Sequence, residues 1–188
     1  MYTHKEYEAI KGKHGLYSSW AIWDNENIKN TSIIDDYFQQ LGVRYVFIGL
    51  NIAKQLTKTP WSNFHGGKHD RKLKKACNDT KLRGSYLTDI FKDIPESKSV
   101  NLKKYIDGNM EVLRTNVAYF NREMEDIKID KETVFIILGT ESSIASKYFK
   151  TYFYGKYGNQ IVNYYHHSYF QLTDDEWVDG LWKTLSIK

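Results

Sequence analysis

Cysteine, proline and long apolar runs are scarce in this sequence, which has one cysteine and two prolines among 188 residues. The single cysteine, Cys77, excludes an internal disulfide and leaves no cysteine cluster for zinc. No segment approaches the roughly 20 apolar residues of a membrane-spanning helix, and the N-terminus lacks the apolar core of a signal peptide. We therefore expect one cytoplasmic domain, residues 1–188, that does not enter a membrane.

Two motifs of common enzyme classes are also missing. The segment GTESS, residues 139–143, offers backbone N–H groups at a helix start, but with one glycine and no lysine it is not a phosphate-binding loop. No G-x-S-x-G motif occurs, which argues against a serine hydrolase. Neither class of enzyme is therefore expected.

Positive charge is modest overall, at a net +4, but it is concentrated in one segment. Residues 68–83 contain only two acids and seven basic residues, which are Lys68, Arg71, Lys72, Lys74, Lys75, Lys81 and Arg83. Such a segment could bind phosphates, but taken by itself it is more simply interpreted as the solvated face of a helix.

Four apolar segments have the composition of buried strands. They are residues 44–50, 85–90, 134–139 and 160–165. Helical patterns alternate with them at 30–41, 70–82, 101–125 and 140–149, and a last one recurs at Trp177, Leu181, Trp182 and Leu185. The segment 18–23, SSWAIW, is interpreted as an edge element, or as the cap of a short helix.

This alternation predicts an α/β fold, a three-layer α/β/α sandwich with a central four-stranded parallel sheet. In such sheets, ligands bind beyond the carboxyl ends of the strands. Three polar and aromatic clusters follow or end predicted strands, so the fold would bring them to one crevice. They are GLNIA at 49–53 with WSNFH at 61–65, SYLTDIFKD at 85–93, and YYHHSYF at 164–170.

In these clusters the chain resembles the uracil-DNA glycosylase superfamily, from about residue 44 to residue 170. The superfamily has a Gly-x-Asp/Asn-Pro motif, a downstream stacking aromatic, a polar base-reading residue after its second strand, and a final His-Pro-Ser. The similar positions here are Gly49-Leu50-Asn51, Asn63-Phe64, Leu87-Thr88-Asp89 and His166-His167-Ser168. The resemblance implies a monomeric DNA-repair hydrolase that acts on DNA or a nucleotide, without metal or organic cofactor.

The resemblance also implies a role for each residue. Asn51 and His166 would be catalytic, orienting a water and stabilising the departing base. Phe64 would stack on the base, and Asp89 would read its edge. The remaining substrate-binding positions would be Gly49, Leu50, Asn63 and Ser168, the last of which could hold a phosphate.

Chemistry explains why these residue types suit cleavage of an N-glycosidic bond. The nucleotide must leave the stack, lie against an aromatic ring, and lose its base as a stabilised anion. An amide such as Asn51 can orient water but cannot take its proton, so the reaction should be slow compared with one that uses a carboxylate.

Three positions depart from the superfamily's pattern. Ile52 and His167 replace prolines, so both loops lose a fixed φ angle. Asp89 stands where uracil-specific members commonly have Asn. An ionised carboxylate only accepts hydrogen bonds, so Asp89 suits a base with an exocyclic amine, or must be protonated to read uracil.

Each position also has a structural interpretation. Asn51 could be a turn residue, Phe64 a core residue, and Thr88 with Asp89 a helix cap. His166 and His167 could be a partly buried core pair or metal ligands, but neighbours on an extended chain face opposite ways. Two further interpretations are a polar cluster of His65, His69 and Asp70, and Glu141 as an alternative base.

Two other function classes remain open. A protein with this fold and a basic groove could bind nucleic acid without turnover, as the two missing prolines and the absent carboxylate suggest. An enzyme acting on a nucleotide or small metabolite on a Rossmann-like sheet is the third candidate.

Overall fold

A five-stranded mixed sheet forms the centre of the protein in the computed structural model, which describes residues 1–52, 58–157 and 160–187. The strands lie in the order β1-β3-β2-β4-β5. Their bounds are β1 Ser19–Trp20, β2 Tyr45–Asn51, β3 Tyr86–Phe91, β4 Val134–Leu138 and β5 Ile161–Tyr164. The predicted α/β class is therefore confirmed, and all four predicted strands form and are parallel.

The prediction of a four-stranded, purely parallel sheet was wrong, because β1 adds an antiparallel edge strand. Ser19 pairs with Leu87 and Trp20 with Tyr86. The sequence analysis placed 18–23 at an edge but did not count it as a strand. Two residues are too short for a periodic pattern, so only the pairing with β3 reveals this strand.

Helices connect the strands and follow the last one. Their bounds are α1 His4–His14, α2 Ser32–Asp36, α3 Asp70–Cys77, α4 Ser99–Asp107, α5 Met110–Asp126, α6 Ile144–Tyr152, α7 Tyr154–Tyr157 and α8 Asp174–Thr184, with a 3₁₀ turn at Phe38–Gln40. The helix predicted at 101–125 is two helices, broken where Asn109 leaves the helical region of φ and ψ. Helix α3 ends at Cys77, before the predicted Leu82.

The N-termini of two helices show capping interactions that the sequence analysis did not assign. Ser143 caps α6 by accepting a hydrogen bond from the Ser146 N–H at 3.1 Å. Helix α1 was not predicted, although Thr3 and Glu6 form a capping box at its start.

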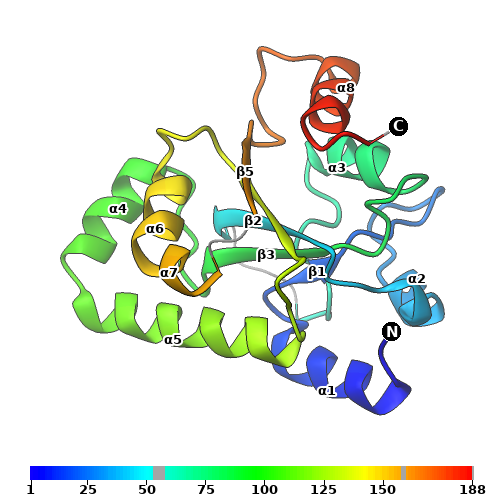
Figure 1. Ribbon diagram of the computed structural model, residues 1–188, viewed down its shortest axis with the longest axis horizontal. Coiled ribbons are helices and arrows are strands. Elements are labelled where there is room, and N and C mark those ends of the chain that lie inside the picture. The colour runs from blue at the N-terminus through cyan, green and yellow to red at the C-terminus, as the bar shows by residue number, and fades with distance from the viewer. Residues whose placement is uncertain (53–57, 158–159, 188) are drawn as a thin grey trace.

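Helices pack against both faces of the sheet and bury two hydrophobic cores (Figure 1). One face packs against α1 and α4 to α7, with Val46 and Ile48 of β2 pointing toward them. The other face, which carries Phe47 and Leu87, packs against α3 and α8. These two helices lie side by side in Figure 1.

The position of β2 in the sheet determines where a ligand site is expected. Strand β2 lies between β3 and β4, so the chain passes from β2 to one neighbour and then crosses to the other. In open α/β sheets, ligands bind at such a reversal of strand order, beyond the carboxyl ends of the strands involved. The ends of β2 and β3, near residues 49–51 and 89–91, lie at this edge of the sheet.

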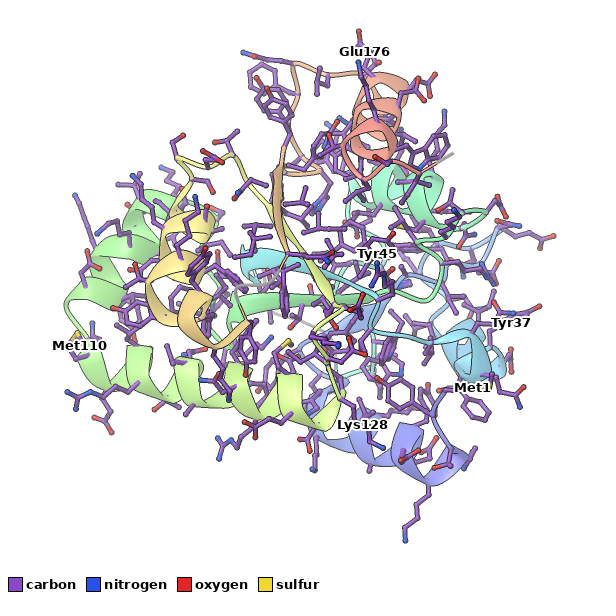
Figure 2. The ribbon with its side chains drawn as sticks, viewed as in Figure 1. Met1, Tyr37, Tyr45, Met110, Lys128 and Glu176 are labelled. Carbon is purple, nitrogen blue, oxygen red and sulfur yellow. The ribbon has the colours of Figure 1, made fainter. Side chains whose placement is uncertain are left out.

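Helix α5 extends along one side of the molecule from Met110 to the turn at Lys128, where it meets α1 (Figure 2). Lys128 forms an ion pair with Glu6 of α1. His14, at the end of α1, lies 2.9 Å from the Asp126 carboxylate. Among the described residues, no helix combines the length and apolar character needed to cross a membrane.

Candidate functional site

Gly49, Phe64 and Asp89 pack together at the carboxyl ends of β2 and β3. Gly49 lies opposite Asp89 in the parallel register. A Cβ atom built on Gly49 would come within 2.1 Å of Asp89 Oδ1 and 3.6 Å of Phe64 Cζ. Only glycine therefore lets the carboxylate and the ring approach the strand this closely.

We expect Gly49→Ala to lower the free energy of unfolding by about 1–3 kcal/mol, because its methyl group overpacks the Asp89 carboxylate. Urea unfolding measures the effect. Gly12→Ala is the matched control, because a Cβ there meets nothing within 4 Å and the residue lies inside α1. That variant should gain about 0.5–1 kcal/mol. Equal effects of the two substitutions would contradict the close packing at Gly49.

The Asp89 carboxylate is buried and bonded to Asn63. Asn63 Nδ2 donates to Asp89 Oδ2 at 2.9 Å, and only 4% of Asp89 is exposed. Burial raises the pKa of Asp89 to about 6, although the Asn63 hydrogen bond acts in the opposite direction. A carboxylate that is costly to ionise, at a strand end, is a feature typical of functional sites.

Phe64 is held in an uncommon backbone conformation, with φ at 63°. Its N–H donates to Asn63 Oδ1 at 3.1 Å, and its carbonyl accepts from Trp23 Nε1 at 3.2 Å. The ring is buried in the core beside α3 and α8. Phe64 therefore has the packing of a core residue and also borders the strand-end cluster.

His167, which the sequence analysis did not include in the site, brings the loop after β5 to this cluster. Its ring centroid lies 6.0 Å from that of Phe64, and its Nε2 lies 3.4 Å from Asp70 Oδ1. Burial alone would raise the pKa of Asp70, but the contacts with His167 and the Gly67 N–H lower it. Asp70 is therefore ionised at neutral pH and orients the imidazole.

His166 is exposed and lies on the outer side of the same loop. Its Nδ1 accepts a hydrogen bond from the Ser168 N–H at 3.2 Å and lies 2.7 Å from Ser168 Oγ. We infer a neutral ring with its proton on Nε2, because Nδ1 is an acceptor.

Asn51 anchors the loop after β3. Its Nδ2 donates to the carbonyl oxygens of Ile94 at 2.9 Å and Glu96 at 2.8 Å. Its side-chain oxygen is left as the group that could orient water.

Leu50 packs against the core on the other face of the sheet. Residues 53–57, which include the end of the GLNIA segment, lie outside the described residues.

Other positions considered in the sequence serve packing. Thr88 lies inside β3 and donates to Glu123 Oε1 at 2.9 Å, so it is not a helix cap. His65 stacks on Trp23 at 5.0 Å, and burial lowers its pKa to about 4. Cys77 is fully buried. Across the described part of the chain, no group of three or more His, Cys, Asp or Glu could hold a metal ion.

Most of the basic side chains of segment 68–83 form ion pairs or hydrogen bonds with other parts of the chain. Arg71 and Lys75 form ion pairs with Asp174 and Asp175 at the start of α8. Lys72 Nζ is buried and donates to carbonyl oxygens of the 165–173 loop, at residues 169 and 172. This segment therefore fixes α8 and its preceding loop, which favours a structural role for these charges over phosphate binding.

A surface groove of about 470 Å³ is lined by a different set of residues. Its lining residues are Trp23, Asn25, Ile33, Tyr37, Asn78, Asp79, Thr80 and Arg83. None of the predicted site residues lines it. The groove could hold a ligand, but it contains neither the buried Asp89 carboxylate nor the imidazoles of His166 and His167. Because these groups can do chemistry, the strand-end cluster remains the candidate site.

Comparison with family models, curated proteins and solved structures gave no match to this chain.

Proposed function

We propose that the protein binds a nucleobase at the carboxyl ends of β2 and β3 and hydrolyses its N-glycosidic bond in DNA. The proposal is supported most directly by the convergence of Phe64, Asp89 and His167 at one strand end, beside the His166 ring. An aromatic face, a buried edge-reading carboxylate and an imidazole N–H donor are the groups that this reaction needs.

His166 would stabilise the departing base. A neutral ring with its proton on Nε2 can donate to an oxygen of the base as negative charge develops there. Ser168 holds the ring in this tautomer through its N–H and hydroxyl groups. Ser168 is therefore better placed to position His166 than to hold a phosphate.

Asn51 would orient the attacking water through its side-chain oxygen. Both N–H groups of the amide are committed to the loop at Ile94 and Glu96, which fixes the direction of that oxygen. Because an amide cannot accept the water's proton, catalysis would come mainly from leaving-group stabilisation. Turnover is expected to be slow.

Cleavage of labelled oligonucleotides tests this function. Single-stranded and duplex substrates carrying uracil, hypoxanthine or a thymine mismatch are incubated with the protein, and alkali-labile sites are counted. We expect His166→Ala to lower the rate about 100-fold or more, because one donor to a developing anion is worth that much. Asn51→Ala should also lower the rate, by a smaller factor than His166→Ala, provided that its unfolding curve matches the native one.

Other results would assign one of the remaining classes. Salt-sensitive binding without abasic products would indicate a nucleic-acid-binding protein of the same fold. Absence of oligonucleotide binding would favour a metabolite enzyme.

An exposed aromatic residue beside the site supports DNA as the substrate. Phe170 is 85% exposed, in the loop between β5 and α8 that stands at the top edge of Figure 1. Tyr165 and Tyr169 in this loop stack on each other, with their ring centroids 4.6 Å apart. Lys72 anchors the loop from below. An apolar side chain held in this way could enter a base stack and fill the space of an extruded nucleotide.

We expect Phe170→Ala to lower the cleavage rate at least tenfold on duplex DNA and less than threefold on single strands, because only a duplex must be unstacked. Rates on matched duplex and single-stranded substrates give the comparison. Met110→Ala is the control, because Met110 is also exposed but lies at the far end of α5. Equal losses on both substrates would show that Phe170 does not act as a wedge.

A further inference from the structure

The amide side chains of the candidate site have already used their hydrogen-bond donors. Asn63 Nδ2 donates to the Tyr17 carbonyl at 2.9 Å and to Asp89 Oδ2 at 2.9 Å. Asn51 Nδ2 donates to two carbonyl oxygens of the 94–96 loop. A primary amide has two N–H groups, so neither residue retains one for the edge of a base.

The Asp89 carboxylate adds acceptors to the same place. Its Oδ2 accepts the hydrogen bond from Asn63. Its Oδ1 occupies the space beside Gly49 that the Cβ atom of any other residue would fill. Lys92 and His167 favour the ionised form, and Glu123 and burial oppose it. At pH 8 the group is ionised, because its pKa is about 6. An ionised carboxylate can only accept hydrogen bonds.

His167 supplies another acceptor. Asp70 is ionised and accepts the Gly67 N–H at 2.7 Å through Oδ2, while its Oδ1 faces His167 Nε2. The proton of a neutral His167 therefore belongs on Nε2, and Nδ1 carries a lone pair. Nδ1 is buried and has no hydrogen-bond partner among the residues described by the structure. A buried acceptor without a partner is costly, and a ligand that donates a hydrogen bond to it removes that cost.

We propose that Asp89 and His167 read a nucleobase edge with two adjacent donors, a ring N–H beside an exocyclic amine, as in guanine-type bases. The inference rests on the proposed nucleobase site and specifies its substrate class. Uracil presents one N–H between two carbonyl groups, so a carbonyl oxygen would face the Asp89 carboxylate without a proton between them. A buried site built to accept hydrogen bonds rejects a ligand that lacks the matching donor.

Binding of guanosine, inosine and uridine at pH 8, measured by calorimetry, tests this inference. Inosine is a matched probe because it keeps the ring N–H of guanosine and lacks only the 2-amino group. We expect guanosine to bind at least tenfold more tightly than inosine or uridine. Equal dissociation constants for guanosine and inosine, or binding of no nucleoside, would overturn the inference.

The variant Asp89→Asn tests the same inference by changing the edge-reading group. An amide both donates and accepts, so we expect the preference for guanosine over inosine to fall below twofold and uridine to bind more tightly than in the native protein. An unchanged preference would overturn the role of Asp89. Removing the charge should not unfold the protein, because ionised Asp89 is costly to bury.

Asp70 would be a positioning residue for His167, and ring ¹⁵N shifts separate this role from a purely structural one. In the native protein we expect a single tautomer of His167, with the proton on Nε2. In Asp70→Asn the tautomers should mix and guanosine should bind more weakly. A native His167 with its proton on Nδ1 would overturn the assignment of this acceptor.

These measurements distinguish the inference from the proposed function. Guanosine-selective binding without abasic sites in any oligonucleotide, including one that carries a modified guanine, would support the base preference and contradict the glycosylase activity. Abasic sites at uracil with no preference for guanosine would support the activity and contradict the base preference.

Discussion

Replacing Glu123 with alanine is expected to lower the free energy of unfolding by about 3–5 kcal/mol, because it leaves a buried lysine unpaired. Glu123 of α5 is fully buried, and its Oε2 lies 2.9 Å from Lys92 Nζ, which is only 5% exposed. The other carboxylate oxygen accepts hydrogen bonds from Tyr86 and Thr88, each at 2.9 Å. Urea unfolding measures the loss.

Two further variants test the cause of this destabilisation. Glu125→Ala removes an exposed acid two residues away, which pairs with Lys156, and should cost less than about 1 kcal/mol. The double variant Lys92→Met with Glu123→Leu should recover much of the stability, because it removes both buried charges. A double variant no more stable than Glu123→Ala would contradict an effect of charge burial.

Replacing Asp89 with asparagine is expected to have the opposite effect and stabilise the protein. The pKa of Asp89 is about 6 in the folded protein, above the ordinary value of 3.8. The folded state therefore binds this proton more tightly than the unfolded chain, so this group costs stability as the pH rises from about 4 to about 6. The cost above pH 6 is about 3 kcal/mol, since each pKa unit corresponds to about 1.4 kcal/mol.

Unfolding free energies of the native protein and Asp89→Asn from pH 4 to pH 8 check this expectation. The advantage of the variant should grow between pH 4 and pH 6 and then stay constant at up to about 3 kcal/mol. Asp79→Asn is the control, since Asp79 is exposed and its replacement should change stability by less than about 0.5 kcal/mol. A difference between Asp89→Asn and the native protein that is independent of pH would show that Asp89 has an ordinary pKa.

Asp89 lowers the free energy of unfolding at neutral pH, and a functional role would explain why a destabilising residue occupies this position. Asparagine could accept the same hydrogen bond from Asn63 without burying a charge. The carboxylate therefore suggests that Asp89 serves ligand recognition rather than stability.

The sequence predicted the parallel strands well, because their apolar runs are continuous and turn residues bound them. Strand β4, VFIIL, is buried at all five positions, as its composition indicates. Helix ends were less accurate. The break at Gly108 and Asn109 depends on local backbone geometry that an amphipathic pattern does not record. The two-residue strand β1 has no pattern at all.

The candidate site was predicted in part, for a physical reason. Gly49 and Asp89 lie in neighbouring parallel strands that end at one edge of the sheet, and Phe64 follows the first of these strands, so topology brings them together. The pair of His167 and Asp70 joins residues far apart in the sequence, and no local signal connects them. Likewise, Glu123 looks like one more polar residue of an amphipathic helix until β3 places Lys92 beside it.

Chemical-shift mapping of ¹⁵N-labelled protein titrated with nucleosides tests the central claim, that the strand-end cluster binds a nucleobase. The account predicts that the amide signals of Gly49, Phe64, Asp89 and His167 shift together and saturate with one dissociation constant. Shifts confined to the groove at Tyr37 and Arg83, or no shifts at any residue, would contradict it.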